Sequence, residues 1–236
     1  MTIAFIFARG GSSMKDKNLR LLLGRSLLQR AIEAAQKVSG IKSVIVSTDS
    51  ETIADAARKG GAETPFRRPS ELASDSAPEW LAWRHAIDWM HHRYGRNALE
   101  RFVSVPTTAP LRLPSDIDQC IQLHEQGGCD VVLTVRPAER SPYFNMVSLG
   151  EDMTVALAAK PAHSIAHRQK ALQLYDVTTV AYVASPDFIM SASGIFEGKV
   201  KAIVVPKERA VDIDDEWDLL TAEVYLRRLN DCGLHA

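Results

Sequence analysis

The sequence opens on the stretch Ile3-Ala4-Phe5-Ile6-Phe7-Ala8-Arg9-Gly10-Gly11-Ser12, and the expected fold is built outward from it. Ile3–Ala8 is a continuous apolar run, which is typical of a strand buried on both faces. Gly10 and Gly11 follow directly and allow the backbone to turn sharply and to approach a ligand closely. The stretch therefore predicts a buried first strand that ends in a turn suited to binding.

Cations gather in and after this turn. Arg9, Lys15 and Lys17 lie within nine residues, and Ser12, Ser13 and Asn18 add neutral hydrogen-bonding groups. Backbone amides combined with Arg and Lys suit an anion with several oxygens, such as a polyphosphate. The turn matches neither a P-loop nor a dinucleotide fingerprint. The alternative is a basic turn that is simply solvated.

Strand and helix patterns alternate along the rest of the chain, which indicates a mostly parallel sheet covered by helices. Helices are expected to begin at Ser26, at Asp49 or Ser50, at Pro78, at Pro114 and near Trp217. The expected later strands are Ser43–Ser47, Phe102–Val105, Asp130–Arg136, Val177–Ala184 and Val200–Val205. We expect one α/β domain over residues 1–236, with a three-layer, Rossmann-like architecture. The irregular stretch 137–173 is expected to form a β-rich arm that covers the sheet edge or meets another subunit.

Composition excludes several classes of function. The chain has 236 residues, of which 46% are hydrophobic, and a net charge of -1, which argues against a general nucleic-acid or membrane-surface binder. Its three cysteines, Cys120, Cys129 and Cys232, form no metal or disulfide pattern and fit a reducing compartment. No apolar run approaches the length of a membrane span. We expect a cytoplasmic protein.

One helix carries an apolar stripe. Its members recur at spacings of three and four, namely Trp80, Trp83, Ile87, Met90 and Tyr94. Such a stripe favours core packing over an aromatic binding site. The histidines of the same helix, at positions 85, 91 and 92, are interpreted as surface residues.

A pair of carboxylates follows the last expected strand. In extended backbone, residues two apart point the same way, so Asp212 and Asp214 can face one point. Mg²⁺ prefers one or two carboxylates together with substrate phosphates, so the pair is a candidate magnesium site. Asp215 is expected to cap the last helix. In the alternative interpretation, all these acids merely favour the helix N-terminus.

Several segments in one order support a family assignment. They are Ala8–Ser12 with Lys17-Asn18, Val46–Ser50, Arg68–Ala73, Pro110–Arg112, Ser141–Asn145 and Val211–Asp214. Together they resemble the acylneuraminate cytidylyltransferases, the CMP-sialic acid synthetase family. The resemblance implies that CTP is joined to a 2-keto-3-deoxy sugar acid, with release of pyrophosphate, by a Mg²⁺-dependent homodimer.

The resemblance also implies roles for individual residues. The nucleotide site would comprise Ala8, Arg9, Gly10, Lys15, Lys17, Asn18 and Arg68. The acceptor site would comprise Thr108, Arg168, Gln169 and Tyr182, with Arg168 as partner of the sugar carboxylate. The residues expected to carry catalysis are Arg9, Lys17 and the metal ligands Asp212 and Asp214. The anomeric hydroxyl would attack the α-phosphorus, and no dedicated protein base for this step is evident from the sequence.

The chain departs from the family pattern at several positions. Ser13 stands where the family has a lysine, and Lys15 is a candidate replacement. Pro106 replaces a glutamine, and Thr178-Thr179 replaces Asn-Gly, so the acceptor side has changed more than the nucleotide side. Two alternatives stay open at this point. One is another sugar nucleotidyltransferase with a different nucleotide or an octulosonic acceptor, and the other is a nucleotide-binding protein without turnover.

Overall fold

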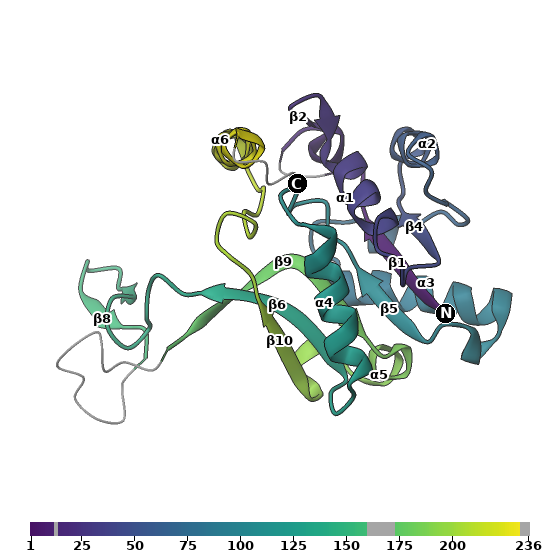
Figure 1. The fold of residues 1–236 in the computed structure, drawn as a ribbon. Helices are drawn as coiled ribbons and strands as arrows, with labels where there is room; N and C mark the ends of the chain where they lie inside the picture. Colours follow the sequence, from purple (N-terminus) through teal and green to yellow (C-terminus); the bar gives the residue numbers. More distant parts are fainter. Residues whose placement is uncertain (12–13, 160–172, 232–236) are drawn as a thin grey trace.

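The structure is a computed structural model that describes residues 1–11, 14–159 and 173–231. Six strands form one sheet in the order β10-β6-β9-β5-β1-β4 (Figure 1). They are β1 (Thr2–Phe7), β4 (Ser43–Ser47), β5 (Arg101–Ser104), β6 (Val131–Pro137), β9 (Tyr175–Ala184) and β10 (Val200–Val204). The helices are α1 (Leu27–Gln36), α2 (Glu51–Lys59), α3 (Glu79–Tyr94), α4 (Pro114–Glu125), α5 (Pro186–Ser191) and α6 (Glu216–Asp231). Two short strand pairs lie outside the sheet: β2 (Leu21–Leu22) with β3 (Arg25–Ser26), and β7 (Val147–Leu149) with β8 (Val155–Leu157).

The sheet is mostly parallel. β1 runs parallel to β4 and β5, and β10 runs parallel to β6, whereas β9 is antiparallel to both β5 and β6. The segment between β6 and β9 leaves the sheet and comes back beside β6, and a direct return of this kind gives an antiparallel neighbour. The predicted mostly parallel α/β fold is confirmed.

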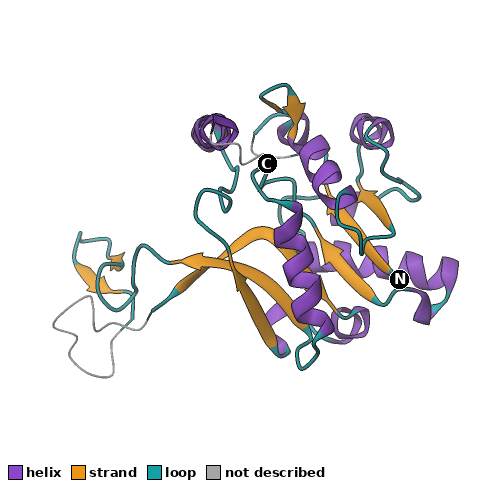
Figure 2. Cartoon of the chain, in the orientation of Figure 1, coloured by secondary structure: helices purple, strands orange, loops and turns teal. Residues whose placement is uncertain are grey.

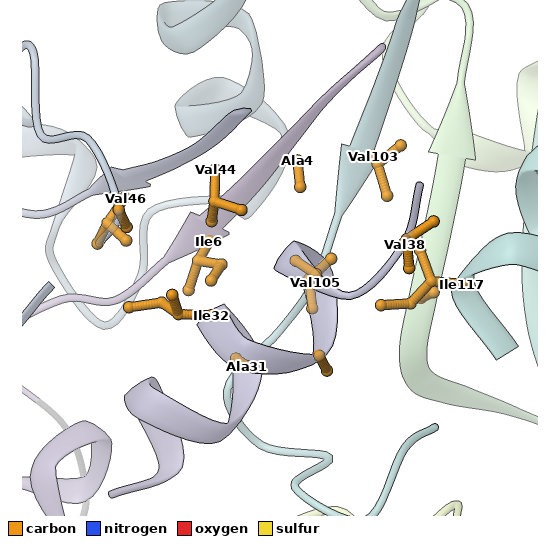
Figure 3. Close-up of a cluster of buried hydrophobic side chains, with 14 of the residues drawn as sticks. Ala4, Ile6, Ala31, Ile32, Val38, Val44, Val46, Val103, Val105 and Ile117 are labelled. Atoms are coloured by element: carbon orange, nitrogen blue, oxygen red, sulfur yellow. The ribbon is translucent and has the colours of Figure 1, made fainter. Parts of the chain in front are cut away.

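Helices cover both faces of the sheet, as the apolar run at the N-terminus predicts (Figure 2). On one face, Ala4 and Ile6 of β1 pack in a cluster with Ile32 of α1 (Figure 3). On the other face, Phe5 packs in a second cluster with Trp83 of α3. Phe5 and Ile6 are both 0% exposed, so alternate residues of β1 serve two separate cores. A third cluster joins α6 to β2 and α1 through residues such as Leu22, Leu27 and Leu226.

The helix starts follow their capping residues. The hydroxyl of Ser26 accepts from the Gln29 amide at 3.1 Å, and that of Ser50 accepts from the Ile53 amide at 3.4 Å. α1 ends at Gln36, and Val38 just after it is buried in the core. The short helix α5 is an element that the sequence patterns did not predict.

The described part of the expected arm extends from the ends of β6 and β9 and carries the β7–β8 hairpin away from the sheet (Figure 1). Every residue of β7 and β8 is exposed. Among the helices of the described residues, none is long and apolar enough to cross a membrane.

Candidate functional site

The glycine turn lies against the start of α2. The Gly10 amide donates to Asp49 Oδ1 at 2.8 Å. A Cβ atom at position 10 would lie 3.1 Å from the Cβ of Ser50, a contact tighter than ordinary packing allows. Glycine therefore lets the turn approach the β4–α2 corner closely.

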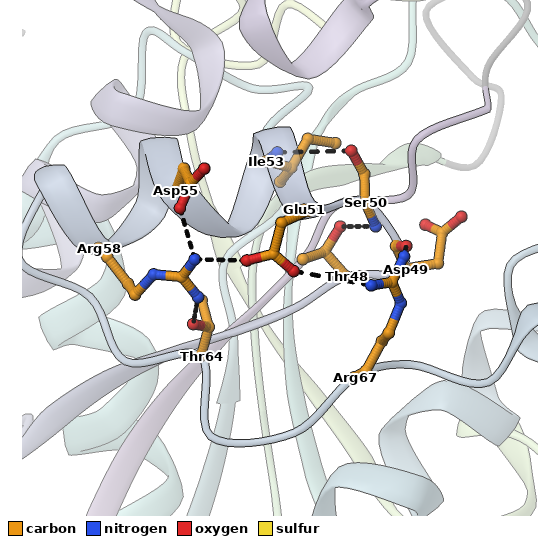
Figure 4. Close-up of polar contacts among 9 residues, drawn as sticks. All are labelled: Thr48, Asp49, Ser50, Glu51, Ile53, Asp55, Arg58, Thr64 and Arg67. Atoms are coloured by element: carbon orange, nitrogen blue, oxygen red, sulfur yellow. Dashed lines mark hydrogen bonds and ion pairs between the residues drawn. The ribbon is translucent and has the colours of Figure 1, made fainter.

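Polar contacts hold that corner in place (Figure 4). Arg67 donates to the Asp49 carbonyl, and Thr48 accepts from the Ser50 amide. On the far side of the same group, Arg58 binds both Glu51 and Asp55 of α2. These contacts fix the start of α2, and with it the Asp49 carboxylate that binds the Gly10 amide.

Two of the predicted phosphate-binding cations, Arg9 and Lys17, lie against carboxylates. Arg9 Nη1 lies 2.6 Å from Asp75 Oδ1, and Lys17 Nζ lies 3.0 Å from Asp214 Oδ1. The side chains of Asp75 and Asp214 are 87% and 75% exposed, so solvent weakens both pairs and an anionic ligand can compete for the cations. Lys15 is exposed.

Asn18 ties the turn to the neighbouring loop. Its Nδ2 donates to the Arg9 carbonyl at 2.9 Å, and its Oδ1 accepts from the Thr107 hydroxyl at 2.6 Å. Ala8 is fully buried and continues the ladder through its amide, which donates to the Ser47 carbonyl. Both residues shape the turn, and any contact of Ala8 with a ligand must come from its backbone.

Arg68 is buried beside the sheet. Its guanidinium donates to the carbonyl and the hydroxyl of Ser47 and stacks on the Phe7 ring, 5.4 Å from the centroid. Burial lowers the pKa of Arg68 to about 10, against the opposing charges of Glu79 and Asp49, so it stays charged at neutral pH. Arg68 therefore supports the wall of the site from behind Phe7.

Asp212 and Asp214 flank a buried residue. Ile213 is 0% exposed, and its amide donates to the Thr108 carbonyl at 2.8 Å, while both aspartates are exposed. Both line a single cavity of about 580 Å³. The expected orientation of the two carboxylates toward one space is what the structure has. Asp215 accepts from the amides of Trp217 and Asp218 and so caps the start of α6 as expected.

The cavity has an aromatic wall, of which the sequence analysis predicted only Tyr182. Phe7, Trp80, Trp83 and Phe196 also line it, together with Glu79. The apolar stripe of α3 is core packing at Ile87 and Met90, as expected, but its first two members face the cavity. Spacing along a helix defines a stripe and does not tell which end reaches the sheet's carboxyl edge. The position of Trp80 directly after the helix start at Pro78 was the available signal.

Two further predicted residues border this cavity. Thr108 donates to the Thr179 hydroxyl at 3.2 Å, and both threonines line the cavity. Burial, with the negative charges of Glu79 and Asp212, raises the pKa of the Tyr182 phenol to about 12, so it is a neutral hydrogen-bonding group. Arg168 and Gln169 lie outside the described residues.

The charges around the cavity favour a cation. Among the described residues that line it, three are carboxylates, Glu79, Asp212 and Asp214, and none is Lys or Arg. The Glu79 carboxylate accepts from the Trp83 indole at 3.0 Å. Although part of Glu79 is exposed, loss of solvation raises the pKa of its carboxyl group. No cluster of three or more His, Cys, Asp or Glu side chains suited to a metal occurs within the described ranges.

Comparisons with known proteins give four findings. A family model described as cytidylyltransferase matches residues 3–202. A CMP-N,N'-diacetyllegionaminic acid synthase of Campylobacter jejuni is 29% identical over 95% of this chain and 94% of its own length. An N-acylneuraminate cytidylyltransferase of Escherichia coli is 28% identical over 97% of this chain and 52% of its own length. The solved structure of a CMP:2-keto-3-deoxy-manno-octonic acid synthetase complexed with CTP superposes with a TM-score of 0.71 at 15% identity, covering 96% of this chain and 98% of that one. At this identity, the structural likeness concerns the fold.

Proposed function

Because this chain belongs to the cytidylyltransferase family, we propose that it transfers the cytidylyl group of CTP to a sialic-acid-like 2-keto-3-deoxy sugar acid. One observation carries the proposal: Lys17 of the cationic turn and Asp214 of the carboxylate pair are in contact at 3.0 Å, at the rim of one cavity. Phosphoryl-type transfer needs a cationic phosphate site next to a carboxylate metal site, and this contact joins the two.

In the proposed reaction, the anomeric hydroxyl of the acceptor attacks the α-phosphorus of CTP. A bond forms between that oxygen and phosphorus, the bond to the bridging oxygen of the β-phosphate breaks, and pyrophosphate leaves. The hydroxyl proton passes to solvent. Arg9 and Lys17 hold the phosphates after leaving Asp75 and Asp214, and so stabilise the charge of the leaving pyrophosphate.

The proposed cofactor is Mg²⁺, held by Asp212 and Asp214. The donors fit this ion, because Mg²⁺ prefers one or two carboxylates together with substrate phosphates. The Lys17 ammonium lies 3.0 Å from Asp214 Oδ1, so this carboxylate has room for a cation beside it. When bound, Mg²⁺ would neutralise phosphate charge and assist attack at phosphorus.

The acceptor is proposed from the relatives and from the cavity. The two relatives described above are named for N,N'-diacetyllegionaminic acid and N-acylneuraminate. Aromatic and apolar side chains such as Trp80, Ile195 and Phe196 border the cavity and suit acyl or deoxy substituents on such a sugar. Arg168 and Gln169 stay proposed partners of the acceptor.

We also propose that residues 1–236 form one nucleotidyltransferase domain and that the arm, residues 137–173, mediates a homodimer. The described part of the arm exposes apolar side chains that have no core of their own, and an isolated two-stranded hairpin is marginally stable in water. These side chains include Phe144, Met146, Val147, Leu149, Val155 and Leu157. A second copy of the chain would cover them.

The test is pyrophosphate release with CTP, UTP, ATP and GTP across a panel of nonulosonic and octulosonic acids. We expect release with CTP and a sialic-acid-like acceptor. Asp212→Asn and Asp214→Asn should abolish most turnover and leave the fold intact, because both side chains are exposed. Release with another nucleotide would favour a different nucleotidyltransferase, and absence of release with every pair would favour a binding protein without turnover.

A further inference from the structure

We propose that the buried guanidinium of Arg112 is a positioning residue for Asp212, acting through a bulge in β9 and the hydroxyl of Thr179. The inference rests on the proposed metal role of Asp212. It concerns how the chain fixes that carboxylate before any ligand binds.

The bulge interrupts the pairing of β9 with β6. Leu133 pairs with Tyr182, but the next residue, Thr134, pairs with Thr178. β6 thus advances by one residue while β9 passes from 182 to 178, and residues 179–181 have no partner on β6. Bulges of this kind re-aim side chains beside active sites. Here the bulge presents Thr179 to the cavity.

The polar groups that the bulge frees are bound from two sides. On one side, the Thr134 hydroxyl accepts from the Ala181 amide at 3.3 Å and lies 3.3 Å from the Thr178 carbonyl. On the other side, Nη2 of Arg112 donates to the Thr179 carbonyl at 3.3 Å and to the Pro106 carbonyl. Arg112 therefore clamps the bulge to the loop that follows β5.

A chain of hydroxyl groups continues from the clamp to the carboxylate. Thr108 donates to Thr179, and Thr179 donates to Asp212 Oδ1 at 3.0 Å. Thr108 also accepts the Ile213 amide through its carbonyl, so side chain and backbone of the metal segment are fixed from the same loop. Groups that orient metal ligands in this way influence metal affinity strongly.

The burial of Arg112 is hard to explain by stability alone. The residue is 2% exposed, and its Nε and Nη1 atoms are buried without a hydrogen-bond partner in the structure. Burial lowers its pKa to about 9, with Asp116 and Asp212 opposing the shift. The Asp116 oxygens accept from Arg209 and from the Leu113 amide, and within the described residues the partners of the Arg112 guanidinium are carbonyls and not carboxylates. A buried cation with unpaired donors is costly for the fold, whereas the two carbonyls it holds belong to the cavity wall.

The experiment measures Mn²⁺ binding by electron paramagnetic resonance, without turnover, in the wild type and in Arg112→Met, Arg112→Lys and Thr179→Val. We expect each variant to keep the wild-type circular dichroism spectrum and to weaken Mn²⁺ binding by roughly 10- to 100-fold. Arg101→Met is the control. The Arg101 side chain is only 18% exposed and donates to the Thr2 hydroxyl. Arg101 lies at the start of β5, at the opposite end of that strand from the loop with Pro106 and Thr108.

Each result decides a separate question. Wild-type affinity in Thr179→Val, which removes a single hydroxyl, or in folded Arg112→Met would overturn the positioning role. Equal weakening in Arg101→Met would show that loss of any largely buried arginine loosens the site, and would overturn the positioning role as well. If the wild-type protein binds no Mn²⁺ with or without CTP, the proposed metal site itself is wrong, which is a different failure.

Discussion

The ion pair between Lys17 and Asp214 brings together two residues with different proposed roles. Each partner is proposed to act on a different group, Lys17 on the phosphates and Asp214 on the metal. While they bind each other, neither charge is unpaired, and the cavity that Asp214 lines has no Lys or Arg among its described lining residues. When CTP binds together with a metal ion, the Lys17–Asp214 pair would be replaced by two contacts, one between Lys17 and a phosphate and one between Asp214 and the metal.

The first prediction follows from this exchange. Lys17→Ala should lower kcat by about 10²–10³, comparable to losing one preorganised charge donor, because the leaving pyrophosphate loses a partner. Binding of Mn²⁺ alone should not weaken, because Asp214 loses a competitor. A wild-type kcat would remove Lys17 from the site.

Lys15→Ala tests whether Lys15 replaces the family lysine that is missing at Ser13. A change in the CTP KM below about twofold would show that it does not.

The second prediction concerns the buried thiol of Cys120. Burial raises the pKa of this thiol from 9.0 to about 12. Between these values the folded protein keeps a proton that the unfolded chain loses, so this group makes stability fall as the pH rises from about 9 to about 12. Cys120→Ala should therefore flatten the alkaline loss of stability measured by urea denaturation.

Alkylation provides an independent check on Cys120. In native protein at pH 8, iodoacetamide should modify the half-buried Cys129 well before Cys120, as resolved by peptide mass spectrometry. Equal rates at the two cysteines would contradict the burial of Cys120.

Prediction of single residues from the sequence succeeded where local backbone geometry determines which way a side chain points. Asp212 and Asp214 share a side because the extended backbone alternates, and Ile213 between them is buried. It failed for Glu79 and Trp80, which reach the cavity only because α3 packs across the sheet. The sequence identified Arg112 as part of a family motif. Its burial beneath Thr179 could not be predicted, because it depends on the bulge in β9, for which the sequence has no local pattern.

At the scale of elements, the arm is the feature whose proposed role depends most on contacts outside its own segment. Leu149 and Val155 are cross-strand partners in the β7–β8 hairpin and are 61% and 64% exposed. Strands β6 and β9 continue to the base of the arm, so a partner bound there would lie on a direct extension of the sheet (Figure 1).

The third prediction tests the arm as an interface. The wild type should sediment near twice 26.0 kDa, and Leu149→Lys combined with Val155→Lys should shift it toward 26.0 kDa, because buried lysines would have to be desolvated. Glu151→Lys, in the exposed turn of the same hairpin, is the control and should remain dimeric. A wild-type monomer with full activity at micromolar concentration would refute the dimer.

For the whole molecule, the alternation of strands and helices predicted the fold class, because buried parallel strands require helices on both faces. It did not predict the strand order, in which β9 lies between β5 and β6. That order follows from the return of the chain after the arm, and the arm has no regular pattern in sequence. The same order brings Thr179 and Tyr182 of β9 beside Thr108, and so builds one side of the cavity.

The central claim is that a sugar-acid hydroxyl attacks the α-phosphorus of CTP at this cavity. The most direct measurement uses an acceptor of the sialic acid class labelled with ¹⁸O at its anomeric hydroxyl, with mass analysis of both products. The account predicts a CMP-sugar that carries the label, together with unlabelled pyrophosphate. Label appearing in pyrophosphate, or CTP consumed without a labelled CMP-sugar, would contradict it.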